Sequence, residues 1–123
     1  MIFGEEGGRG TSESEARKII HAYLDAGGNH IDTANAYVGG VSEEITGRAI
    51  KGIREEVFLA TKCNFPTQPG PNHYGLSRFN IIDSVEGSLR RMETDYIDLL
   101  YVHCWDEWTP VEESMRALDD MVT

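Results

Sequence analysis

The hydrophobic positions of this chain follow two spacings, one typical of amphipathic helices and one typical of buried strands. The segments with helical spacing lie near 13–26, after Ser42, over 78–92 and after Thr109. The shorter apolar segments are 29–33, 56–62 and 96–103. Amphipathic helices that alternate with buried strands indicate a parallel sheet joined by crossover connections. We therefore predict an α/β protein built from parallel βα units.

Each predicted helix has an apolar face, and two of the helices have a recognisable start. Ser12 and Glu15 have the spacing of a capping box, and Thr109 followed by Pro110 is typical of an N-cap and a first helical residue. The apolar positions of the four helices are Ala16, Ile19, Ile20, Tyr23 and Leu24; Ile45, Ala49 and Ile53; Ile82, Val85, Leu89 and Met92; and Val111, Met115, Leu118 and Val122. We expect these faces to cover the sheet.

The number of strands limits the architecture and predicts a partner. Three strands with four helices cannot close a barrel, and Met1–Phe3 adds at most the remnant of a fourth strand. An open sheet has unpaired edges and a face that loses its cover, so we expect self-association, most simply as a twofold homodimer. The residues expected to include the uncovered ones are Val57, Leu59, Ile97, Leu99 and Tyr101.

Composition and charge exclude several classes of protein. The 123 residues fit a single domain, and 11 basic against 21 acidic residues give a net charge of −10, which argues against nucleic acid or an anionic membrane as partner. The glycine-rich segment 4–10 lacks the features of a phosphate-binding loop. Without an export signal or an apolar run of spanning length, we expect a cytoplasmic protein in which Cys63 and Cys104 are reduced thiols.

Ionisable residues of three types close the three predicted strands. Asp32, Lys62 and His103 stand at these strand ends, and Tyr37 follows Asp32 by five residues. The carboxyl ends of parallel strands lie at one edge of a sheet, so we expect these side chains to gather there. Each residue alone also has an ordinary structural explanation.

Together, the four side chains favour proton transfer to a carbonyl oxygen. A tyrosine in water ionises only near pH of about 10, and a nearby lysine cation stabilises its anion. In this arrangement Asp32 would keep Lys62 charged, and neutral His103 would donate an N–H group to the substrate oxygen.

Two further features near the last strand have alternative explanations. A metal site would have to use His103, Cys104 and Asp106, with His30 or His73. That spacing matches no standard zinc set, so no metal is predicted. Trp105 and Trp108 either line a pocket for an apolar carbonyl compound or cover exposed core. The long Pro- and Gly-rich loop 64–77 is of the length that tends to be functional.

The segments that carry these residues resemble the aldo-keto reductase family. Segments 28–37, 40–44 and 47–49 resemble the first signature region of the family, Ala60–Lys62 its catalytic lysine strand, and Ser88–Leu99 its second signature. The resemblance implies a (β/α)8 barrel and reduction of an aldehyde or ketone with NADP(H) or NAD(H). By the resemblance, Tyr37 is the proton donor, Lys62 and Asp32 assist it, Asp32 also contributes to cofactor binding, and His103 orients the substrate.

The length of the chain departs from the family. Such barrels typically need about 250 residues, so residues 1–123 resemble one half-barrel domain that lacks most of strand 1 and the C-terminal half. In the family, that second half supplies most of the cofactor site. We therefore expect weak or absent cofactor binding and activity from the isolated chain. The alternative is a non-catalytic, self-associating half-barrel that retains the four residues.

Overall fold

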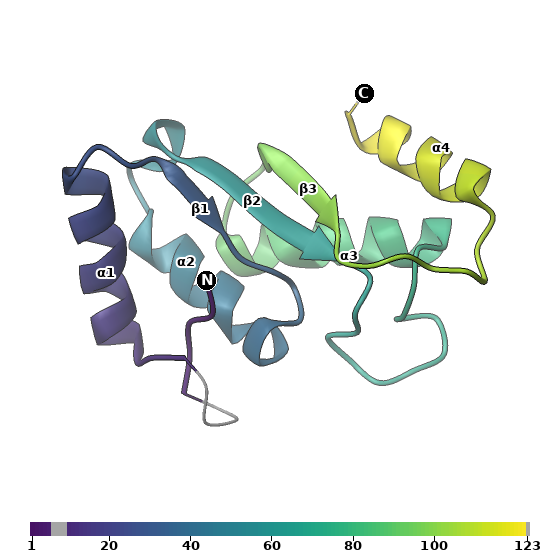
Figure 1. Ribbon diagram of the computed structural model, residues 1–123, viewed down its shortest axis with the longest axis horizontal. Helices are drawn as coiled ribbons and strands as arrows, with labels where there is room; N and C mark the ends of the chain where they lie inside the picture. The colour runs from purple at the N-terminus through teal and green to yellow at the C-terminus, as the bar shows by residue number, and fades with distance from the viewer. Residues whose placement is uncertain (6–9, 123) are drawn as a thin grey trace.

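The fold is an open parallel sheet with three helices against one face, as the computed structural model of residues 1–5 and 10–122 shows (Figure 1). The strands are β1 (His30–Asp32), β2 (Phe58–Cys63) and β3 (Leu99–Val102), in the spatial order β1-β2-β3. The helices are α1 (Glu13–Asp25), α2 (Val41–Ala49), α3 (Arg78–Met92) and α4 (Val111–Val122), with short 3-10 helices at Tyr37–Gly40 and Arg54–Glu56. The predicted order of helices and parallel strands is confirmed.

The N-terminal segment is not a strand in this structure. Met1 donates from its amino group to the Asp32 carbonyl at 2.6 Å, and the Phe3 N–H donates to the Ser42 hydroxyl at 3.1 Å. The predicted loop 4–10 includes residues 6–9, which lie outside the described residues. In the part of the chain that is described, the sheet therefore has three strands, and no helix there is long and apolar enough to cross a membrane.

Alternation along β2 decides which residues meet the helices. Leu59 is fully buried among core residues, and Val57 before the strand is 3% exposed, whereas Phe58 between them is 40% exposed. Val57 and Leu59 are therefore not among the uncovered residues that the predicted set of five was expected to include. Successive side chains of a strand point to opposite faces, and these two share the face under α1 and α2.

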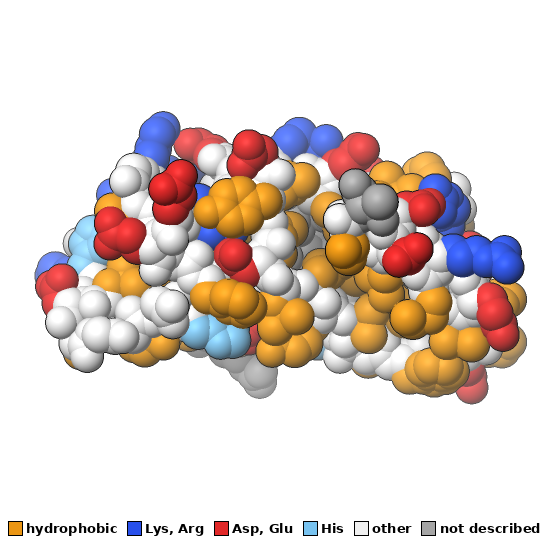
Figure 2. All heavy atoms as spheres, turned by 90° about the horizontal axis from the view of Figure 1, so that it is seen from above, with side chains coloured by type: hydrophobic (Ala, Val, Ile, Leu, Met, Phe, Trp, Pro, Cys, Tyr) orange, Lys and Arg blue, Asp and Glu red, His pale blue; other side chains and the backbone are white. Residues whose placement is uncertain are grey.

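The uncovered face is made by the alternate residues of the strands. Lys62 is in register with Tyr101, and Ala60 is in register with both Asp32 and Leu99, so these side chains share one face. Tyr101 is 40% exposed. Leu99 and Tyr101 thus lie on the uncovered face, as predicted, whereas Ile97 packs against the core. Figure 2, which views the molecule from above, shows hydrophobic side chains gathered on this side.

Strand β3 is shorter than predicted. Just before it, the Asp98 carboxylate takes the place of a backbone carbonyl as the partner of the Leu59 N–H. Asp98 accepts a hydrogen bond from the Leu59 N–H at 2.8 Å through its carboxylate, and its own N–H donates to the Leu59 carbonyl at 3.0 Å. The same carboxylate pairs with Arg54 at 2.8 Å, and that guanidinium lies 3.8 Å from the centre of the Tyr96 ring. This cluster closes the amino end of the sheet, opposite the candidate site.

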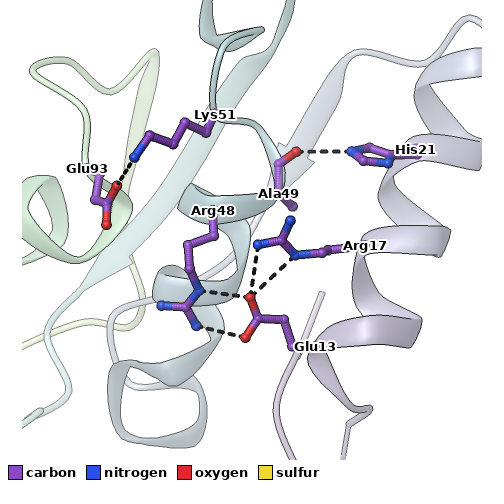
Figure 3. A network of polar contacts seen from close by, with 7 residues as sticks. All are labelled: Glu13, Arg17, His21, Arg48, Ala49, Lys51 and Glu93. Atoms are coloured by element: carbon purple, nitrogen blue, oxygen red, sulfur yellow. Dashed lines mark hydrogen bonds and ion pairs between the residues drawn. The ribbon is translucent and has the colours of Figure 1, made fainter.

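Helices α1 and α2 are joined by the carboxylate of Glu13 (Figure 3). Arg48 of α2 donates to both oxygens of this carboxylate, at 2.8 and 3.0 Å, and Arg17 donates to one of them. The hydrogen bond from Arg48 lowers the pKa of Glu13. Farther along α1, the His21 ring lies 3.1 Å from the Ala49 carbonyl. The buried face of α1 is narrower than predicted, because Ile19 and Tyr23 are exposed.

Helix α2 begins one residue before Ser42 rather than after it. Gly40, with φ of 99°, turns the chain into the helix, and the buried Ser42 hydroxyl lies 2.8 Å from the Thr33 hydroxyl. Farther along, a Cβ on Gly47 would lie 2.5 Å from the backbone of Met92 at the end of α3. Only glycine allows α2 and α3 to approach this closely.

Helix α4 packs through its small residues, which differs from the prediction. Ser114 and Ala117 are buried against α3 and the chain before it, and the Ser114 hydroxyl donates to the Leu76 carbonyl at 2.8 Å. The large residues of the predicted face are exposed, namely Val111, Met115 and Val122, whereas Leu118 is half-buried. Of these four residues, Leu118 and Val122 border a groove of about 580 Å³ between α3, α4 and the edge of β3.

Candidate active site

The carboxyl ends of the strands bring Lys62 and Asp32 into direct contact. The Lys62 ammonium group donates to the Asp32 carboxylate at 2.7 Å and to the Thr33 carbonyl at 2.8 Å. The lysine side chain is 14% exposed and that of Asp32 is 39% exposed. A cation held in this way is fixed in position and has a counter-ion, as the sequence led us to expect.

Tyr37 and His103 complete the group around this ion pair. Tyr37 begins the 3-10 helix after β1, and the Lys62 nitrogen lies 5.0 Å from the centre of its ring. His103 directly follows β3, and its ring centre lies 5.7 Å from that of Tyr37 at an interplanar angle of 84°. All four residues singled out in the sequence therefore lie at one edge of the sheet.

The electrostatic setting favours neutral His103. Burial and the neighbouring Lys62 cation lower the pKa of its imidazole, and the Asp32 carboxylate opposes this shift only in part. At neutral pH the ring therefore carries one N–H donor and one acceptor nitrogen. A neutral imidazole can donate a hydrogen bond to a carbonyl oxygen.

Several buried polar atoms at this edge have no hydrogen-bond partner among the described residues. They are Asp32 Oδ1, Asn35 Oδ1, Asn64 Oδ1 and His103 Nδ1. Buried polar groups are normally paired, so such a concentration marks a place where water or a ligand is expected. This capacity favours a binding site over a purely structural ion pair.

The two asparagines were not predicted from the sequence. Asn35 is 1% exposed, its N–H donates to the Lys62 carbonyl at 3.2 Å, and its side chain donates to the Phe65 carbonyl at 3.1 Å. It thereby connects the loop after β1 to the end of β2. Polar residues in loops are usually exposed, so the sequence offers no signal for this burial apart from the position of Asn35 beside the signature residues.

Aromatic rings from the loop after β2 form one wall of the site. The Phe65 ring lies 4.8 Å from His103 in an edge-to-face arrangement and 6.1 Å from Tyr74. By contrast, Trp105 and Trp108 are 72% and 85% exposed. Their predicted contribution to a substrate pocket stays a prediction, whereas Phe65 already contacts the site.

Neither the thiols nor the acidic residues form a metal site in the described part of the chain. No group of three or more His, Cys, Asp or Glu side chains there is arranged to hold an ion. Both cysteines are free thiols, and burial raises the pKa of Cys63 to about 11. A thiol in that state is a poor ligand, because metals bind the thiolate.

The sequence matches the model of the aldo/keto reductase family over residues 1–123. This chain belongs to the aldo/keto reductase family. It is 43% identical over 114 residues to the aldo-keto reductase YhdN of Bacillus subtilis, a match that covers 91% of this chain and 34% of that protein. It is also 43% identical over 108 residues to a protein of Oryza sativa named probable voltage-gated potassium channel subunit beta, covering 85% and 33% of the two chains.

The solved structures support the same family and fix the fold. The aldo-keto reductase AKR11C1 from Bacillus halodurans matches with a TM-score of 0.81 and 37% identity, over 91% of this chain and 38% of that one. The chain thus spans about a third of the length of the curated relatives that it matches. Its open sheet corresponds to part of the (β/α)8 barrel of an aldo-keto reductase, so the predicted fold class is confirmed.

Proposed function

We propose that this chain carries the proton-donating part of an NAD(P)H-dependent carbonyl reductase, with Tyr37 as the acid. The observation that carries the proposal is the position of Lys62. Its ammonium group is held by Asp32 at 2.7 Å and lies 5.0 Å from the centre of the Tyr37 ring. A fixed cation beside a phenol stabilises the negative charge that forms as the proton leaves.

Each residue has one task in the proposed reaction. His103, neutral at the working pH, donates a hydrogen bond that orients the substrate oxygen. Tyr37 then gives its proton to that oxygen, and Lys62 stabilises the resulting phenolate. Asp32 keeps Lys62 charged and in place. The substrate is a small aldehyde or ketone that fits beside the Phe65 ring.

A nicotinamide dinucleotide fits one feature of this edge. When bound, it supplies the hydride that reduces the carbonyl carbon. Asp32 Oδ1 is buried and unpaired among the described residues, so it can accept a hydrogen bond from a hydroxyl of such a molecule. The described residues offer little else to hold it, so we expect weak binding. A fluorescence titration with NADPH tests this, and tight binding by the isolated chain would contradict it.

The function is tested by turnover of 4-nitrobenzaldehyde with NADPH. We expect slow reduction by the wild-type chain and a loss of about 10²–10⁴-fold in Tyr37→Phe, the usual contribution of a positioned general acid. Tyr96→Phe is the matched control, because Tyr96 stacks on Arg54 at the opposite end of the strands and should leave the rate unchanged. An active Tyr37→Phe variant would rule out the proposed acid.

The uncovered sheet favours self-association as a second property of the chain. Phe58 of the central strand β2 and Tyr101 of the edge strand β3 are each 40% exposed. Figure 2 shows hydrophobic side chains gathered on this side of the molecule. We propose a twofold homodimer that covers this face, because a self-complementary contact closes on itself. If the chain has no reductase activity, this interaction remains as its alternative role. Light scattering should give twice the monomer mass, and a stable monomer at high concentration would contradict the dimer.

A further inference from the structure

Two non-glycine residues with positive φ, Val38 and Asn64, lie close in sequence to the candidate active-site residues. Among the described non-glycine residues, Val38, Asn64 and Glu93 have positive φ, at 53°, 121° and 51°. Val38 and Glu93 lie near the left-handed helical minimum. Asn64 lies well outside that minimum, in a region that glycine adopts far more readily. Asn64 comes two residues after Lys62 and is 1% exposed.

The strained conformation lets the Asn64 side chain reach the neighbouring strand end. Its Nδ2 donates to the Cys104 carbonyl at 3.0 Å. The amide orientation is defined, because a carbonyl can only accept and so requires the nitrogen to face it. One residue earlier, the His103 N–H donates to the Cys63 carbonyl at 2.9 Å. Hydrogen bonds to the β2 end therefore hold the chain on both sides of the His103 side chain.

The backbone of Asn64 is fixed as well. Its carbonyl accepts from the Gly75 N–H at 2.8 Å and from the Asn80 side chain at 3.5 Å. The Asn80 side chain also donates to the Gly75 carbonyl at 2.7 Å. The end of the long loop and the start of α3 therefore support the position from which Asn64 reaches Cys104.

We propose that Asn64 is a positioning residue that fixes the His103 ring opposite Lys62 and Tyr37. This inference rests on the proposed function of those three residues. Asn64 need not touch the substrate for this role. It sets the distance between the ends of β2 and β3, from which Lys62 and His103 project. The strained backbone is retained because only in that conformation does the amide meet the Cys104 carbonyl.

The test is Asn64→Gly, which relieves the backbone strain and removes the amide. The readout is the His103 imidazole in an NMR titration of the whole chain. Burial and Lys62 now lower its pKa, while Asp32 opposes them and the Tyr37 ring lies against it. We expect the His103 pKa to rise toward the ordinary value of about 6.5 and its ring signals to broaden. The unfolding temperature should stay equal or rise.

A matched control separates positioning from strain. Glu93→Gly relieves the cost of a positive φ at the end of α3, remote from the site, where glycine is the favoured residue. It should raise the unfolding temperature and leave the His103 titration as in the wild type. An Asn64→Gly variant with an unchanged His103 pKa would overturn the proposal.

A second variant keeps the side-chain size but replaces the donor by a carboxylate. In Asn64→Asp, the side chain cannot donate to the Cys104 carbonyl, so we again expect broadened His103 ring signals, whereas the added negative charge raises the His103 pKa in any case. If the His103 ring signals of this variant are as sharp as those of the wild type, the proposal is wrong. Both readouts are independent of turnover. Failure of the reductase assay with a shifted His103 pKa would count against the proposed function and leave the positioning role supported.

Discussion

Arg91 at the end of α3 holds a buried carboxylate, and its removal should cost much of the stability of the chain. Glu43 of α2 is fully buried, and its Oε2 accepts from Arg91 Nε at 2.6 Å. The other carboxylate oxygen accepts from the Thr61 hydroxyl of β2 at 2.5 Å. These contacts connect α2, α3 and the sheet. In Arg91→Ala, Glu43 keeps the hydroxyl contact but loses its cation.

The expected loss follows from the burial of the pair. Breaking a buried ion pair by removing one partner typically costs about 3–5 kcal/mol, because the remaining charge is uncompensated. Arg91 is 20% exposed and therefore partly hydrated, so the lower half of that range applies. For a chain of 123 residues, each kcal/mol corresponds to roughly 4 °C in the unfolding temperature. We therefore expect a fall of roughly 12–16 °C.

The neighbouring Arg90 supplies the matched control. Its side chain is 69% exposed and pairs with Glu86 at 3.8 Å, so Arg90→Ala should change stability by less than about 1 kcal/mol. Urea unfolding is best followed by far-ultraviolet circular dichroism, because Trp105 and Trp108 are largely exposed already and report little change. Equal losses in the Arg90 and Arg91 variants would show that the buried Glu43 carboxylate does not depend on Arg91. Adding Glu43→Gln to Arg91→Ala should recover part of the loss, because the uncompensated charge is gone.

Two further predictions concern titration and thiol chemistry. Hydrogen bonds from the Leu76 N–H, Thr109 and the Trp108 N–H lower the pKa of Asp106 in the folded chain. The contribution of Asp106 to stability is therefore complete above about pH 4, near the pKa of an unfolded aspartate, and is lost as the pH falls through the lower pKa of the folded state. The stability advantage of the wild type over Asp106→Asn should shrink in that acidic range, and a constant advantage would contradict the shift. Iodoacetamide should label Cys104 in the folded chain but Cys63 only in urea, because Cys63 is buried and its pKa is raised to about 11. Equal labelling rates of the two cysteines in the folded chain would show instead that Cys63 is accessible.

Much of the fold could be predicted because local patterns and packing agree. The third helix was predicted over 78–92, and α3 has these bounds, although of its predicted apolar face only Val85 and Met92 are buried, and Ile82 and Leu89 are half-buried. The strand ends with Asp32, Lys62 and His103 were also found, because an ionisable residue that closes an apolar strand is visible in the sequence. Parallel topology then places such residues at one edge without further information.

The errors arose where the sequence does not state which face is covered. The apolar run of β2 shows no alternation, so only the structure places Leu59 under the helices and Phe58 on the uncovered face. The amphipathic face of α4 was identified, yet the helix packs through Ser114 and Ala117. Asn64 was missed because its burial depends on a backbone conformation and on a carbonyl contributed by another strand end.

Carbonyl reduction by this chain is tested most directly by following deuterium from a labelled cofactor into the product. The chain is incubated with 4-nitrobenzaldehyde and NADPH that carries deuterium at the transferred position, and the alcohol is analysed by mass spectrometry, which detects even slow turnover. We predict that the wild type forms alcohol with one deuterium on the former carbonyl carbon, and that Tyr37→Phe forms at least about 10²-fold less. Absence of labelled alcohol from the wild type, or equal yields from both proteins, would contradict the proposed carbonyl reduction by Tyr37, Lys62, Asp32 and His103.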